Sequence, residues 1–122
     1  MSDSTNPPLS VKTPPLKDRV YRGAALLDHE LPGWWQDIDL DRLNMASDET
    51  CVLGQIFGSF SNGGRQQIFG KRVSPAVIGD YGFGPVTKWE RATDDRSDMN
   101  ALWRAEIEAR RAAHPRLEYD DA

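Results

Sequence analysis

Two segments of the chain repeat apolar residues at the spacing of an amphipathic helix. In the first segment these residues are Leu16, Val20, Ala24, Leu27 and Leu31. Their spacing puts them on one helix face, with Arg19 and Arg22 off that face. Thr13-Pro14-Pro15 favours a helix start, and Pro32-Gly33 favours its end because proline cannot continue the helical hydrogen bonds. We therefore predict a helix between these two signals.

The second amphipathic pattern lies near the C-terminus. Its apolar face consists of Met99, Leu102, Trp103 and Ile107. Asp94, Asp95 and Ser97 are candidate N-caps, and several alanines support helix formation as far as Ala113. Because His114-Pro115 follows, we predict that the last helix ends there.

The most apolar stretch of the chain, residues 51–60, lies between these two patterns. Ser47 precedes it as a candidate N-cap, and the stretch is long enough to form the central helix of the fold. Gly54 and Gly58 each lower the helix propensity by about 1 kcal/mol. We therefore expect another helix or loop to approach closely on their side.

A shorter apolar pattern comes before the central stretch. Ile38, Leu40 and Leu43 are its candidate buried positions. They do not alternate as a strand would, so we favour a helical turn capped by Asp37 or Asp39. A packed loop is the alternative.

The part of the chain after the central stretch is rich in turn-forming residues. Residues 61–64 read Ser-Asn-Gly-Gly, which predicts a turn. Ser74-Pro75 predicts a short helix over residues 76–78, followed by an irregular glycine-rich loop over residues 79–85. Residues 65–73 are interpreted as a short strand or one arm of a hairpin.

These elements together predict a mainly α fold. It is a compact small domain of about three main helices plus short helical turns, and a small β-hairpin within residues 65–87 would make it α+β. We expect residues 15–115 to form a single helical domain. Residues 1–14 are polar and proline-rich, which predicts a disordered arm, and residues 116–122 predict a flexible acidic tail.

Composition narrows the range of functions. The 122 residues carry a formal net charge of −4, which argues against electrostatic binding of nucleic acid over the whole protein surface. The N-terminus lacks the pattern of a signal peptide, and no apolar stretch reaches the roughly 18 residues of a membrane span. We therefore expect a cytoplasmic protein that does not interact with a membrane.

The sequence offers little for catalysis or metal binding. Cys51 is the only cysteine, so an intramolecular disulfide and a cysteine-rich zinc site are excluded. A helix N-terminus could lower the pKa of its thiol, but only His29 and His114 are available as a base. A small buried residue is the favoured interpretation of Cys51. We predict no catalytic residue, no metal ligand and no cofactor.

Two other patterns resemble ligand sites only superficially. The alternating Asp37, Asp39 and Asp41 lack the glycine and the distal glutamate of a calcium-binding loop, so capping and solvation explain them better. The glycine-rich residues 61–65 and 79–84 could present amides to a phosphate. Neither matches a P-loop, and turns are the favoured interpretation.

Aromatic residues beside glycine are the best interaction candidates, because such residues often anchor interfaces. They are Trp34, Trp35, Tyr81 and Phe83. Adjacent residues on a helix point about 100° apart. We therefore expect at least one of the two tryptophans to be partly exposed.

Basic residues form a second candidate surface. On the last helix and beyond it these are Arg104, Arg110, Arg111 and Arg116, with Arg65, Lys71 and Arg72 elsewhere. Glu106 and Glu108 interrupt the group, which suits a solvated helix with ordinary ion pairs.

Several short elements together resemble a group of small uncharacterised proteins encoded by bacteriophages of actinobacteria. In order they are Gly23-Ala24, Leu27-Asp28, Leu31-Pro32-Gly33-Trp34, residues 38–43, residues 51–58 and Tyr81-Gly82-Phe83, followed by the tryptophan-containing last helix. The resemblance covers roughly residues 20–110. It implies a phage origin and expression in the cytosol of an infected bacterium, and it carries no activity or site with it.

We interpret the chain as a non-catalytic bacteriophage accessory protein, not an enzyme, that binds a host or phage protein, alone or as a homo-oligomer. A nucleic-acid-binding regulator that uses the basic residues of the last helix is the alternative. An enzyme that acts on a small ligand is the third hypothesis.

Overall fold

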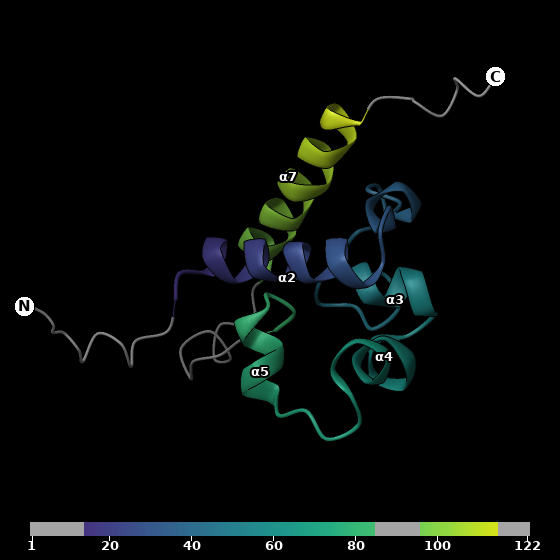
Figure 1. Cartoon of the computed structure of the whole chain (residues 1–122), viewed down its shortest axis with the longest axis vertical. Helices are drawn as coiled ribbons and strands as arrows, with labels where there is room; N and C mark the ends of the chain where they lie inside the picture. Colours follow the sequence, from purple (N-terminus) through teal and green to yellow (C-terminus); the bar gives the residue numbers. More distant parts are fainter. Residues whose placement is uncertain (1–13, 85–95, 115–122) are drawn as a thin grey trace, which may run out of the picture.

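The computed structural model describes residues 14–84 and 96–114, and this part of the chain is mainly helical, with no strand (Figure 1). Its elements are α2 (Leu16–Glu30), the 3-10 turn η2 (Trp34–Asp37), α3 (Val52–Phe57), the π-helical turn η3 (Phe60–Gly64), α4 (Arg65–Phe69), α5 (Pro75–Asp80) and α7 (Ser97–Ala113). The predicted mainly α fold is confirmed. The predicted arm, apart from Pro14, and the predicted tail lie outside the described residues.

The two long helices α2 and α7 cross and pack against each other (Figure 1). Both were predicted, and both bury the apolar faces that their sequences indicate, but Arg19, which was predicted to lie off the apolar face of α2, is buried as well with 1% exposed. The fully buried or nearly buried residues of these faces are Val20, Ala24, Leu27, Met99, Trp103 and Ile107. No helix in the described parts of the chain has the length and apolar character needed to cross a membrane.

Trp103 of α7 lies at the centre of the core, with none of its surface exposed. Its indole Nε1–H donates to the carbonyl oxygen of Gly82 at 2.7 Å. The ring of Phe83 stacks on it with centroids 4.9 Å apart, and Trp34 meets it edge-on at 5.8 Å. On α2, Gly23 leaves room for this contact, since a Cβ atom there would meet Tyr81 O and the Trp103 ring.

The predicted central helix is much shorter than the apolar stretch that suggested it. Helix α3 covers only Val52–Phe57 and is capped by Cys51, whose Sγ accepts from Gly54 N at 3.2 Å. Gly58 ends the helix in a left-handed conformation with φ of 91°. Ser47 caps the preceding turn instead, where its Oγ accepts from Thr50 N at 3.2 Å.

The expected close approach holds for one of the two glycines. A Cβ atom at Gly54 would collide with the carbonyl oxygen of Asp48, so the loop before α3 does pack against the helix here. At Gly58 the expectation is wrong, because nothing lies within 4 Å of the corresponding position. That glycine serves to stop the helix rather than to admit a neighbour.

The strand or hairpin arm predicted over residues 65–73, and with it the hairpin over 65–87, is wrong for the described residues. The predicted turn at 61–64 is part of η3, and it leads directly into helix α4. Gly64 lets the start of α4 lie against Leu53 of α3, because a Cβ atom there would be 2.6 Å from Leu53 Cβ. This close contact with α3 favours the helical path.

The short helix predicted after Ser74-Pro75 is confirmed as α5. Ser74 Oγ accepts from Val77 N at 3.3 Å, and proline occupies the first turn as expected. The helix extends to Asp80, so the irregular loop is shorter than predicted.

The helical turn predicted over residues 38–43 does not form there. The nearest helical turn, η2, ends before these residues, at Asp37. Ile38 is extended, and Asp39 to Arg42 form a tight turn closed by a hydrogen bond from Arg42 N to Asp39 O at 3.1 Å. The packed loop, the alternative interpretation, is therefore correct for these residues. Gln55 of α3 holds this loop, since its amide bonds to the backbone N and O of Asp39 at 2.7 and 3.1 Å.

The contact at Gly23 predicts how the substitution Gly23→Ala changes the stability of the fold. Helix propensity alone would make Gly23→Ala stabilising by about 1 kcal/mol. Because the new methyl group would collide with Tyr81 O and Trp103, we expect a destabilisation of about 1–3 kcal/mol instead. Urea unfolding followed by circular dichroism measures the difference.

The control is Ala25→Gly at an exposed position of the same helix, which should lose about 1 kcal/mol through propensity alone. A more stable Gly23→Ala protein would contradict the close packing of α2 against the 81–84 loop.

Candidate functional site

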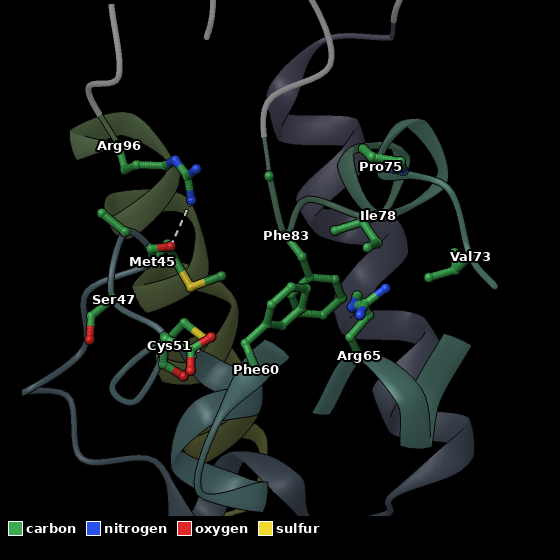
Figure 2. Close-up of a pocket in the computed structure, with 13 residues that line it drawn as sticks. Met45, Ser47, Cys51, Phe60, Arg65, Val73, Pro75, Ile78, Phe83 and Arg96 are labelled. Atoms are coloured by element: carbon green, nitrogen blue, oxygen red, sulfur yellow. Dashed lines mark hydrogen bonds between the residues drawn. The ribbon is translucent and has the colours of Figure 1, made fainter. Parts of the chain in front are cut away.

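A pocket of about 480 Å³ opens between the loop before α3 and the segment that carries η3, α4 and α5 (Figure 2). Its apolar lining includes Met45, Cys51, Phe60, Val73, Pro75, Ile78 and Phe83. Figure 2 shows Met45, Ser47, Cys51 and Arg96 on one side of Phe83, and Arg65, Val73 and Ile78 on the other. A volume of about 300–1,000 Å³ is typical of sites that bind small molecules.

Among the described residues, three charged side chains line this pocket: Asp48, Arg65 and Arg96. Arg96 is partly engaged, since its Nη1 donates to Met45 O at 2.8 Å. Asp48 is engaged as well, because its carboxylate accepts from Ser59 Oγ at 2.6 Å and from Ser61 N at 2.8 Å. These hydrogen bonds lower the pKa of Asp48. The side chain of Arg65 forms no hydrogen bond or ion pair with any described residue and is half-buried.

The sequence alone does not reveal this pocket. Its lining comes from four separate segments that meet only after folding, near residues 45–51, 60–65, 73–84 and 96. No spacing rule connects them. The one aromatic candidate that reaches the pocket is Phe83.

Cys51 forms part of the pocket wall but is only 4% exposed. Burial raises the pKa of its thiol, and this effect outweighs the hydrogen bond from the Gly54 amide, which lowers it. The amide at the helix N-terminus thus lowers the pKa as suggested, but the net shift of the Cys51 pKa is upward. The favoured interpretation of Cys51 as a small buried residue is confirmed. Both histidines have other neighbours, since His29 bonds to Glu30 and His114 stacks on Trp35.

The expectation that one of the adjacent tryptophans is partly exposed is wrong. Trp34 and Trp35 are 2% and 8% exposed. The turn η2 contacts α7, and this contact buries both indoles. Trp34 packs edge-on against Trp103, and Trp35 stacks on His114 with ring centroids 5.3 Å apart. Of the other candidates, Phe83 is 5% exposed and Tyr81 is half-buried against Phe69. The four aromatic candidates thus pack on the core.

The described arginines of the last helix, Arg104, Arg110 and Arg111, donate hydrogen bonds within the protein. Arg104 Nη2 donates to Leu40 O at 2.7 Å, and Arg111 Nη2 donates to Ile38 O at 2.6 Å. These bonds tie α7 to the loop that follows η2. Arg116 lies outside the described residues.

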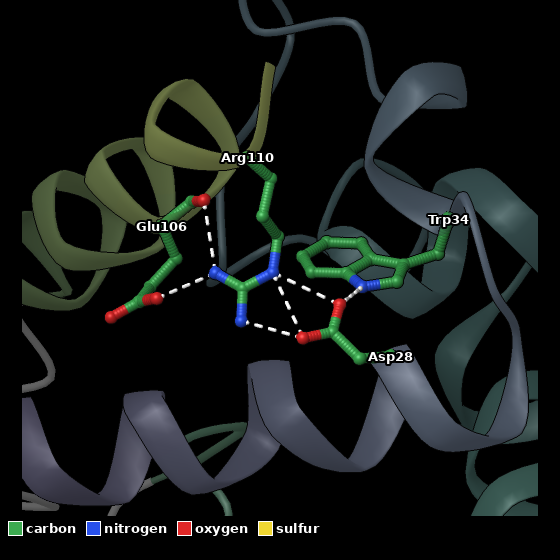
Figure 3. Close-up of polar contacts among 4 residues, drawn as sticks. All are labelled: Asp28, Trp34, Glu106 and Arg110. Atoms are coloured by element: carbon green, nitrogen blue, oxygen red, sulfur yellow. Dashed lines mark hydrogen bonds and ion pairs between the residues drawn. The ribbon is translucent and has the colours of Figure 1, made fainter. Parts of the chain in front are cut away.

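Arg110 forms the most extensive of these contacts (Figure 3). It pairs with Asp28 of α2 at 2.8 Å and with Glu106, one helical turn away, at 2.7 Å. Asp28 also accepts from the indole N–H of Trp34 at 2.9 Å. The hydrogen bonds from Arg110 are the main reason that the pKa of Asp28 lies below its ordinary value.

The aspartate and glycine patterns are structural, as their favoured interpretations state. Asp39 Oδ1 accepts from Asp41 N at 3.0 Å, which stabilises the local turn. In the glycine-rich loop, the carbonyl oxygens of Gly79 and Gly82 accept from Arg19 and Trp103. Among the described residues no cluster of three or more His, Cys, Asp or Glu side chains could hold a metal ion.

Comparisons with known protein families, with curated proteins and with solved structures found no match to this chain. The resemblance to actinobacteriophage proteins therefore stays a prediction.

The ion pair of Asp28 predicts a pH dependence. Its lowered pKa means that the pair stabilises the fold above the unfolded value of about 3.9, and that this stability is lost as the pH falls through the lower folded value. The Asp28 side chain is 44% exposed, so solvent screening limits the contribution to about 1 kcal/mol at most.

We expect Asp28→Asn to be less stable than the wild type at neutral pH, with a difference that shrinks towards zero in acid. Urea unfolding at about pH 7 and at about pH 2.5 measures it. The asparagine oxygen can still accept from Trp34, so the variant isolates the charge. A difference that is the same at both pH values would contradict the ion pair.

The burial of Cys51 predicts an unreactive thiol. In the folded protein we expect a disulfide reagent such as DTNB to react only as fast as the domain opens, because the thiol is covered and its pKa is raised. An added exposed thiol, Ala101→Cys, should react at once and serves as the control. Rapid reaction of the wild type at neutral pH would show that Cys51 is accessible.

Proposed function

We propose that the protein is a non-catalytic accessory protein that binds another protein through the pocket described above. The observation that supports this most strongly is the pocket itself, which combines an apolar lining with a half-buried arginine that has no described partner. Concave sites with a few well-placed polar groups are typical binding sites. A phage origin and action in the cytosol of an infected bacterium are part of the proposal and rest on the resemblance alone.

The chemistry of the pocket favours binding over catalysis. Its thiol is buried with a raised pKa, and neither histidine lines it. The carboxylate of Asp48, the one carboxylate among the described lining residues, accepts hydrogen bonds from Ser59 and Ser61. These residues offer neither an activated nucleophile nor a paired acid and base.

The nucleic-acid alternative gains no support from the described arginines of α7. A phosphate backbone is bound by cationic side chains that can turn towards it. Arg104, Arg110 and Arg111 instead donate to carbonyl and carboxylate oxygens of the protein.

A pocket-blocking variant tests the proposal. Ala46 is exposed and lies at the pocket, so Ala46→Trp should fill the opening without disturbing the core. The matched control is Ala105→Trp on the exposed side of α7. We expect the tagged wild type and the control to recover the same protein from an actinobacterial lysate, and Ala46→Trp to lose it by mass spectrometry.

Equal recovery by all three proteins would place the contact outside the pocket. Recovery of nucleic acid that all three proteins share, and that high salt removes, would favour the nucleic-acid alternative.

A further inference from the structure

We infer that the pocket recognises an acidic segment of a partner protein, in which a bulky apolar side chain lies next to a carboxylate. This inference rests on the proposed function and specifies the chemistry of the partner. The apolar side chain enters between Phe60 and Ile78, and the carboxylate bonds to the guanidinium of Arg65 (Figure 2).

The apolar half of this recognition follows from the lining. Phe60, Val73 and Ile78 surround the space together with Phe83, and the first two are only partly buried by the protein itself. Covering such a surface with an apolar side chain removes it from water, which favours binding. Phe83 is fixed by its stacking on Trp103, so this part of the wall is rigid before binding.

The acidic half follows from the charges at the pocket. The carboxylate oxygens of Asp48 accept hydrogen bonds from Ser59 and Ser61. One donor of Arg96 bonds to the carbonyl oxygen of Met45. The guanidinium of Arg65 donates no hydrogen bond to any residue that the structure describes. A planar guanidinium that is half-buried beside apolar side chains is well suited to bind a carboxylate in bidentate fashion.

The cationic character of this site contrasts with the rest of the chain. The whole protein carries a formal net charge of −4, whereas the described residues that line the pocket include two arginines and one aspartate. The net negative charge of the protein disfavours an acidic segment overall, whereas the two arginines of the pocket attract it. This contrast would fix the position of the segment rather than merely raise its affinity.

A nucleic acid phosphate is the less favoured anion. A phosphate backbone extends over many charges, and the described arginines that could continue such a surface from α7 are bonded internally. One accessible guanidinium among apolar side chains fits a single carboxylate beside an apolar residue better.

Selection from a yeast-displayed library of random short peptides tests the inference with the full-length protein. We expect the enriched peptides to carry Asp or Glu within two positions of Phe, Tyr, Trp, Leu or Ile. Their Kd should rise roughly tenfold or more with Arg65→Gln, since hydrogen bonds between charged groups are about twice as strong as neutral ones.

The matched control is Arg72→Gln, an exposed position outside the pocket, which should leave Kd unchanged. Arg65 lies at the start of α4 with no side-chain bond to lose, and glutamine has a similar helix propensity, so the variant should fold. Unchanged circular dichroism and unfolding curves verify this.

The outcomes separate this inference from the proposed function. Enriched peptides without acidic residues, lost with Ala46→Trp but not with Arg65→Gln, would overturn the acidic preference and keep the pocket as a protein-binding site. No enriched peptides, together with tight binding of free 3-phenylpropionate detected by NMR, would overturn both in favour of a small-molecule site.

Discussion

The indole of Trp103 is fully buried, and its N–H group must find an acceptor inside the protein. The carbonyl oxygen of Gly82 supplies one, which requires the 81–84 loop to lie across the packed pair α2 and α7. Gly23 makes this possible because any side chain there would collide with Tyr81. The same loop holds Phe83 against Trp103 and so fixes one wall of the pocket. The proposed binding surface thus depends on the core beneath it.

The arginines of helix α7 hold the end of α2, the turn η2 and the start of the loop that follows η2. Arg110 pairs with Asp28, which also accepts from Trp34, and Arg111 donates to the backbone carbonyls of Trp35 and Ile38. These bonds explain how two adjacent tryptophans become buried on a single short turn. They also engage the cationic groups that would otherwise suggest nucleic-acid binding. Arg65, which lines the pocket, has no hydrogen-bond partner in the described part of the chain.

The long helices were predictable because apolar residues recur at helical spacing on one face of each, from Val20 to Leu27 and from Met99 to Ile107. The short elements were harder to predict. An apolar run over residues 51–60 indicates a helix, yet it cannot show that Gly58 stops the helix. Helix periodicity likewise suggested an exposed tryptophan. That expectation failed because the residues that cover Trp34 and Trp35 are distant in sequence, at Trp103 and His114. The pocket was missed for the same reason, as long-range contacts create it.

Hydrogen–deuterium exchange of the full-length protein, with and without a peptide that it binds, tests the central claim most directly. We predict that the peptide slows exchange in residues 45–51, 60–65 and 73–84, which line the pocket. Residues 34–37 and the exposed side of α7 should exchange at unchanged rates. Slower exchange confined to the tryptophan turn or to α7 would contradict the account, because it would place the binding surface on elements that the structure uses for its own packing.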